Sequence, residues 1–170
     1  QAHQGIGPGA RCQHAGTLIR VALQHQLATL LRQPTGRLDL LPYAALLDLS
    51  FERVGEELQL VMPFAETLIG SPGRLHGGSI GGLLELAGLL TVIAAQPEGE
   101  ALPRVRPVTV TVDFMREGAC LETRAAASIT KLGRRVVNVH AQAWQGSRDK
   151  PIAAAHINFV LDWPEARQAP

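Results

Sequence analysis

The chain has 170 residues, a length that suits one domain. Hydrophobic residues make up 46% and aromatic residues only 4%, so we expect a core of leucine, valine, isoleucine and alanine. Sixteen basic and fifteen acidic residues leave a formal net charge of +1, which excludes a broad electrostatic surface for nucleic acid or for a membrane.

The cysteines and histidines form no disulfide or metal-binding pattern. Cys12 and Cys120 lie far apart in the sequence, and we predict that both are reduced thiols. The six histidines are scattered without ligand spacing, so no bound metal is predicted. Residues 1–10 lack the basic and then apolar pattern of a secretory signal, and we therefore expect a cytoplasmic protein.

The first 36 residues are predicted to hold a flexible tail and one helix. Residues 1–13 are rich in glycine, proline and glutamine, which is typical of a mobile tail. Apolar residues then recur at intervals near 3.6 and predict an amphipathic helix over 14–32, which Pro34 and Gly36 end. The apolar positions are Ile19, Leu23, Leu27, Leu30 and Leu31.

The main domain is predicted to cover residues 37–163, with a tail over 164–170. It begins with a short apolar segment over 38–48, which we expect to be a helix. Two further apolar segments, 49–54 and 58–63, flank the turn sequence Gly-Glu-Glu. This arrangement indicates a β-hairpin.

A long apolar helix is predicted over 77–95, after a loop over 68–75 that contains two glycines and a proline. The helix is apolar on nearly every side, so protein must surround it. Its apolar run has Glu85 as its one charge and is shorter than the roughly 20 residues that span a bilayer. We therefore expect a core helix and no membrane partner.

After this helix the apolar residues alternate with a period of two, which predicts strands. Three or four strands are expected, within the segments 108–114, 120–131, 137–144 and 151–161. Tight turns between them make neighbouring strands antiparallel. The order of elements predicts an α+β fold in which a curved antiparallel sheet wraps around the long central helix, with an extra N-terminal helix.

Glu85 is three or four residues from Gly81, Gly82, Gly88 and Leu89, so these residues share one side of the helix. Each glycine inside a helix costs about 1 kcal/mol relative to alanine. A glycine-rich stripe therefore indicates the close approach of another backbone or of a ligand. Two interpretations stay open: Glu85 points to water, or it is a catalytic carboxylate in a partly apolar pocket.

The sequence His76-Gly77-Gly78 stands at the start of the long helix. The first amides of a helix have no partner inside it and carry partial positive charge. Glycine at this point lets a ligand come close, as at an oxyanion or carbonyl site. The alternative is that the two glycines only shape a turn.

Together, these features resemble the hotdog-fold acyl-CoA thioesterases, and most of all the PaaI-like, phenylacetate-degradation-associated group. The shared features are His-Gly-Gly and an acid nine residues after the histidine. The flanking segments "LIGSPGRLHGG", "VTVTVDFMREG", "KLGRRVVNVHAQAW" and "KPIAAAHINFVL" are also similar. The resemblance covers about residues 40–162 and leaves out the helix over 14–32.

The resemblance implies hydrolysis of an acyl-CoA thioester to the free acid and coenzyme A, without a metal or redox cofactor. Gly77 would donate its backbone N–H to the thioester carbonyl, and Glu85 would act as general base or nucleophile. His76 would hold the loop, with Gly78 beside it.

The sequence departs from the family at two places. Many relatives have asparagine or glutamine in the loop before His-Gly-Gly, where this chain has Gly70-Ser71. Ser71 is then the candidate to replace that side chain at the substrate. Some relatives also place a hydroxyl residue one turn after the acid, where this chain has Leu89.

A distance predicts that the protein is an oligomer. Glu85 follows Gly77 by eight residues, so the two are about 12 Å apart along one helix. Reacting atoms must approach to about 3–3.5 Å. One chain therefore cannot assemble the site, whereas Gly77 of one copy can face Glu85 of another in a homodimer or a dimer of dimers (a homotetramer).

Basic residues near the predicted strand ends are candidates for binding the phosphates of coenzyme A, because guanidinium groups suit phosphate. The main candidates are Lys131, Arg134 and Arg135, with Arg74 and Arg104 as weaker ones. The alternative is that these are ordinary solvated residues in turns.

Two other functions remain open at this point. A hotdog dehydratase acting on acyl thioesters is disfavoured, because no proline follows His76 within the turn. A non-catalytic acyl-CoA-binding protein, serving as a sensor or scaffold, stays possible because of Gly70-Ser71 and the N-terminal helix. Aliphatic walls suit aryl and medium-chain acyl groups equally, so the sequence does not select between them.

Overall fold

The computed structural model describes residues 22–96 and 102–163. A helix over 22–30 comes first, followed by β1 (Thr35–Arg37), α2 (Pro42–Leu46), β2 (Ser50–Val54) and β3 (Glu57–Met62). A 3₁₀ turn, η1 (Glu66–Leu68), and two short strands, β4 (Ile69–Ser71) and β5 (Arg74–Leu75), lead into α3 (Gly77–Ala94). The chain ends with β6 (Arg104–Phe114), β7 (Thr123–Leu132), β8 (Val136–Trp144) and β9 (Pro151–Asp162).

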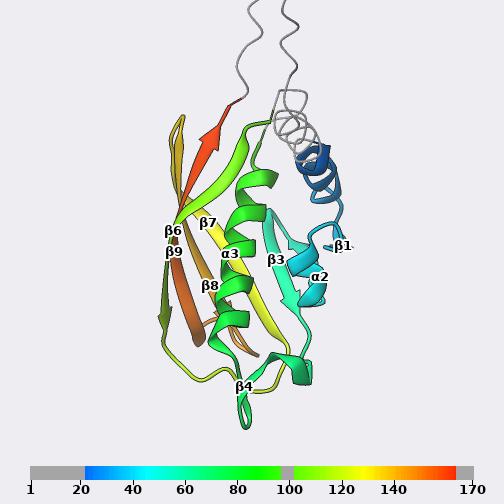
Figure 1. The fold of residues 1–170 in the computed structure, drawn as a ribbon, viewed down its shortest axis with the longest axis vertical. Coiled ribbons are helices and arrows are strands. Elements are labelled where there is room, and N and C mark those ends of the chain that lie inside the picture. Colours follow the sequence, from blue (N-terminus) through cyan, green and yellow to red (C-terminus); the bar gives the residue numbers. More distant parts are fainter. Residues whose placement is uncertain (1–21, 97–101, 164–170) are drawn as a thin grey trace, which may run out of the picture.

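One antiparallel sheet contains seven of the described strands, in the order β1-β2-β3-β7-β8-β9-β6. The strand that directly follows α3, β6, lies at the edge of this sheet and pairs with β9, the last strand. Figure 1 shows the sheet curving around α3, which lies along one of its faces. The predicted α+β architecture, a curved antiparallel sheet around a long central helix, is confirmed.

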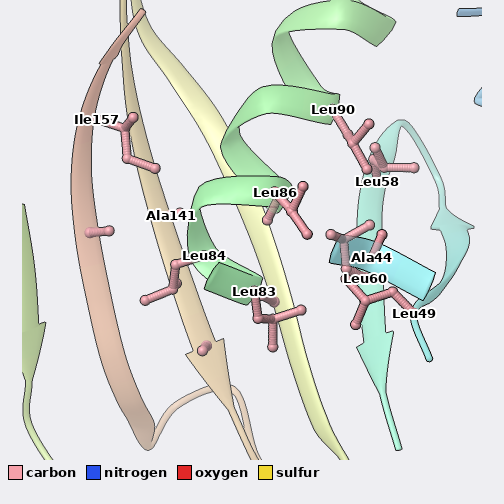
Figure 2. Close-up of a cluster of buried hydrophobic side chains, with 14 of the residues drawn as sticks. Ala44, Leu49, Leu58, Leu60, Leu83, Leu84, Leu86, Leu90, Ala141 and Ile157 are labelled. Atoms are coloured by element: carbon pink, nitrogen blue, oxygen red, sulfur yellow. The ribbon is translucent and has the colours of Figure 1, made fainter. Parts of the chain in front are cut away.

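The core lies between α3 and the sheet. Leu83, Leu84 and Leu90 of α3 are fully buried, as are Leu60 of β3 and Ala141 of β8. Figure 2 shows side chains of α3 directed at β3 on one side and at β8 and β9 on the other. Because apolar residues occur all round the helix, the sheet must curve to cover them.

By length and composition alone α3 could cross a membrane, since its 18 residues have a mean hydropathy of 1.6. Half of this stretch is buried inside the domain. The core helix of a folded domain has the same composition, and the packing of α3 on the sheet accounts for its apolar character.

Two local features differ from the sequence-based expectation. The segment after the first helix, expected only to end it, forms β1, in which Gly36 pairs with Phe51 of β2. A Cβ on Gly36 would lie 2.7 Å from the Phe51 ring, so this strand needs glycine. The expected loop over 68–75 contains the β4–β5 hairpin, whose turn places Gly73 at a φ of 77°.

The first helix belongs to the same core as the sheet. Leu27 and Leu31 are buried in it, and the Gln24 side chain donates to the carbonyl of Pro103. Residues 14–21 of the predicted helix, the tails over 1–13 and 164–170, and Cys12 lie outside the described residues. The expected helix over 38–48 is shorter, Pro42–Leu46, and the strands expected over 108–114 and 120–131 begin at Arg104 and Thr123.

Candidate active site at the start of the central helix

His76 caps the N-terminus of α3. Its Nδ1 accepts the backbone N–H of Gly78 at 2.9 Å, and its carbonyl accepts the N–H and the hydroxyl of Ser79 at 3.0 and 2.7 Å. Its own N–H donates to the carbonyl of Leu68 at 2.7 Å, which ties the helix start to η1. These bonds fix the conformation of the His-Gly-Gly segment.

The cap distinguishes the two glycines. The amide of Gly78 is occupied by the His76 imidazole, whereas the amide of Gly77 has no hydrogen-bond partner among the described residues. Gly77 therefore offers a free N–H at the positive end of the helix. This is the kind of donor that can polarise a carbonyl group.

Glu85 lies two turns further along α3 and is half-buried. Its carboxylate forms no hydrogen bond or ion pair with any residue in the described ranges. Because the Glu85 carboxylate has no partner, it is suited to accept a proton once a ligand or a second copy of the chain lies against this part of the helix.

The glycines around Glu85 do not form one ligand-facing stripe, which corrects the sequence interpretation. A Cβ on Gly82 would lie 2.5 Å from the ring of Tyr43, and a Cβ on Gly88 would lie 3.0 Å from Ile157. Both glycines thus make room for neighbouring side chains of the same chain. Only Gly81 faces open space, with no atom within 4 Å of a Cβ position.

Two aromatic side chains border this open face of α3. Tyr43, from α2, packs on Gly82, and its hydroxyl lies 3.4 Å from the carbonyl of Gly78. Phe114, at the end of β6, packs on Gly77. Gly77 and Gly82 lie on opposite sides of Glu85 around the helix axis, so the two aromatic side chains lie on either side of Glu85. Phe114 is 57% exposed, so much of its ring remains free to contact a ligand or another chain.

Sequence reasoning missed the roles of both aromatic residues. They are two of seven aromatic residues in the chain, and Tyr43 is the only tyrosine. This rarity is a weak signal. Nothing in the sequence shows that α2 or the end of β6 reaches the start of α3.

A groove of about 450 Å³ adjoins the helix start between α2 and η1. Its lining includes His76 and Gly78, the exposed apolar side chains of Leu46 and Ile69, and Tyr43. The groove can take an apolar group whose polar end lies near the first turn of α3.

The loop residues singled out before His-Gly-Gly have different surroundings. A Cβ on Gly70 would lie 2.7 Å from the Cα of His76, so glycine is required here by the fold of the loop. Ser71 is exposed in the β4–β5 hairpin, opposite Arg74. It does not line the groove.

The basic candidates lie mostly at the opposite end of the sheet. Arg134 and Arg135 form the turn between β7 and β8, where the carbonyl of Arg135 accepts the N–H of Leu161. Lys131 is exposed near the end of β7. Arg104 is ten residues along β6 from Phe114, a distance of about 33 Å. Arg74 is closer to His76 in the sequence and forms a 2.9 Å ion pair with Glu117.

No group of three or more histidine, cysteine, aspartate or glutamate side chains with metal-binding geometry occurs in residues 22–96 and 102–163. Cys120 is a free thiol. The open face of α3 supplies an amide donor at Gly77 and an acid at Glu85.

A long apolar helix on a curved antiparallel sheet, with a glycine pair at the helix start, is the arrangement of the hotdog fold. The chain belongs to the acyl-CoA thioesterase family, because a family profile described as the acyl-CoA thioesterase N-terminal domain matches residues 69–160. No curated protein matches this chain.

Solved structures share the fold of this chain. A protein from Chromobacterium violaceum is 32% identical, with a TM-score of 0.59 over 77% of this chain and 88% of that one. A phenylacetic acid degradation-related protein from Ralstonia eutropha is 20% identical, with a TM-score of 0.61 over 70% and 89%. A protein from Bacillus halodurans, solved with CoA, is 18% identical, with a TM-score of 0.63 over 74% and 80%.

Proposed function

We propose that the protein hydrolyses an acyl-CoA thioester to the free acid and coenzyme A, at a site formed between two copies of the chain. The observation that carries the proposal is the free N–H of Gly77 at the start of α3, together with the unpartnered carboxylate of Glu85 on the same open helix face. Membership of the thioesterase family and the likeness to a CoA-bound structure support it.

In the proposed reaction the Gly77 N–H polarises the thioester carbonyl. Glu85 takes a proton from water, whose oxygen attacks the carbonyl carbon to give a tetrahedral oxyanion. The C–S bond then breaks, the thiol of coenzyme A leaves with a proton returned by Glu85, and the acid is released. Direct attack by Glu85 gives an anhydride that water cleaves to the same products. Neither route requires a metal or redox cofactor.

The oligomer is proposed from the edge of the sheet. No described strand pairs with the outer edge of β6, and its apolar residues Val108 and Val110 are exposed. An unpaired apolar edge is a template for another strand. Antiparallel pairing of two β6 strands about a two-fold axis brings the helix start of one copy beside the middle of α3 in the other. Gly77 and Glu85 are then supplied by different copies.

The acyl group is proposed to occupy the groove beside His76 and Gly78. Leu46, Ile69 and Tyr43 give it an apolar lining that suits an aryl or medium-chain acyl group. The proposed dimer also turns the basic end of one copy, with Arg104, toward the helix start of the other. Lys131, Arg134 and Arg135 at that end are the proposed ligands for the coenzyme A phosphates.

The test is thiol release, followed with a chromogenic disulfide, from acyl-CoAs running from acetyl through octanoyl to phenylacetyl and hydroxybenzoyl. Glu85→Gln keeps the shape of the side chain and removes the base, so turnover should fall at least about a hundredfold. CoA binding should be retained. No release from any substrate while CoA esters still bind would indicate a sensor or scaffold, and formation of an enoyl thioester would indicate a dehydratase.

A further inference from the structure

The face of the sheet opposite α3 carries two adjacent histidines. His140 of β8 and His156 of β9 are direct cross-strand neighbours, and their ring centroids lie 4.9 Å apart at an interplanar angle of 42°. Thr111 of β6 and Ser128 of β7 continue the same row on either side. The two imidazoles are therefore held by central strands, sixteen residues apart in the sequence, and separated from α3 by the sheet itself.

The spacing of the rings matches two ligands on one metal ion. Zinc binds imidazole nitrogen at about 2.0–2.1 Å, so two imidazoles at an angle near 100° on one ion have ring centroids about 5 Å apart. The observed separation of 4.9 Å is within this geometry before any movement of the side chains. Small rotations about the side-chain bonds then suffice to direct one nitrogen of each ring at a common point.

The chemical state of the rings also favours metal binding. Neither imidazole forms a hydrogen bond with any residue in the described ranges, so both have free nitrogen atoms. Partial burial, and then the neighbouring His156, lower the pKa of His140. His156 is exposed, so an ion can reach the pair from solvent.

Charged residues of β6 and β7 stand in adjacent rows of the same face. Asp113 of β6 lies in the row of Ala154 and Gln142, and Lys131 of β7 lies in the row of Asn138. Because no carboxylate or thiolate stands in the histidine row itself, the site suits ions that prefer imidazole nitrogen over ions that need several oxygen ligands.

We propose that His140 and His156 form a two-imidazole binding site for one divalent transition metal ion per chain, of the zinc, nickel or copper class, with water completing the coordination. The site is independent of the proposed thioester hydrolysis, since it lies across the sheet from α3 and uses none of the residues at the helix start.

The test uses the full-length chain without a histidine tag. Calorimetric titration with Ni²⁺ and Zn²⁺ should show one ion per chain, whereas Mg²⁺ should show no binding. His140→Asn and His156→Asn should each weaken metal binding at least about tenfold. Removing a residue that only hydrogen-bonds to a metal ligand already costs about that much affinity, and each of these variants removes a ligand itself. His25→Asn, which changes an exposed histidine on the first helix, should bind as the wild type does.

Three further measurements keep the proposal open to refutation if a variant folds poorly. Zn²⁺ should shift two imidazole NMR signals of the wild-type protein, and it should raise the temperature of unfolding by mass action. Binding should weaken below pH 6 as protons compete for the rings. Equal affinity in His140→Asn, His156→Asn and the wild type, or no binding by the wild type, would overturn the proposal.

Discussion

The Nδ1 atom of His76 accepts the backbone N–H of Gly78 at 2.9 Å, and this one hydrogen bond leaves Gly77 as the free amide of the helix start. His76→Ala removes the cap, so the free energy of unfolding should fall by about 1 kcal/mol. Turnover should fall as well, because the Gly78 amide then competes for the carbonyl and the loop loosens. Urea unfolding and thiol release measure the two effects.

The control for this prediction is His76→Asn, because asparagine is also a good N-cap residue. It should recover most of the lost stability. If His76→Asn and His76→Ala are equally unstable, the side-chain cap does not hold the helix start.

The two neighbouring glycines Gly81 and Gly82 should respond differently to alanine. Gly81→Ala adds a methyl group in open space and should leave stability unchanged or raise it by up to about 1 kcal/mol. It should lower turnover, because the methyl group narrows the proposed ligand face. Gly82→Ala should lower stability, because its Cβ would lie 2.5 Å from the Tyr43 ring.

Urea unfolding at a fixed protein concentration checks the glycine pair. The double variant Gly82→Ala with Tyr43→Ala should regain part of the stability lost by Gly82→Ala, since the two residues are in contact. A more stable Gly82→Ala than Gly81→Ala would contradict the position of Tyr43.

Val110 of β6 tests the dimer. Val110→Lys places a charge on the exposed apolar edge of the sheet and should shift the protein to monomers, with loss of thiol release in parallel. Size-exclusion chromatography with light scattering measures the mass over a range of concentrations. Val54→Lys, at an exposed valine near the end of β2, should leave both the mass and the activity unchanged. An active Val110→Lys monomer would refute a site shared between copies.

The ion pair between Glu57 and Arg148 should make stability depend on pH. Hydrogen bonding from Arg148 holds the pKa of Glu57 below its ordinary value of 4.5. A carboxyl group whose pKa is lower in the folded state than in the unfolded state stabilises the folded protein at pH values above its unfolded-state pKa. This stabilisation is lost as the pH falls through the folded-state pKa. Stability should therefore decline below about pH 4.5.

Arg148→Met should remove this part of the acid sensitivity while keeping an apolar side chain against Trp144, which the Arg148 guanidinium now covers at 4.9 Å. The effect should be small, since both side chains are partly exposed. Urea unfolding at pH 7 and pH 3.5 compares the two proteins, and an equal decline in both would mean that other carboxylates account for it.

Much of the fold follows from local patterns in the sequence. The bounds of α3 are predictable because an apolar run lies between a glycine-rich start and a proline-glycine end. Strands β7 to β9 are predictable because segments of alternating apolar residues lie between turn residues. The spacing of Gly77 and Glu85 on one helix also follows from the sequence. Because this spacing is about 12 Å, the sequence also shows that Gly77 and Glu85 of one chain cannot act on the same carbonyl group.

Tertiary structure decided what local patterns do not encode. β1 is a strand only because it pairs with β2. Val108 and Val110 of β6 are exposed on a strand that lies at the edge of the sheet. The contacts of Tyr43 with Gly82 and of His140 with His156 join residues far apart in the chain. Such contacts depend on strand order and register, which are set by the packing of the whole sheet around α3 and not by the residues on either side of them.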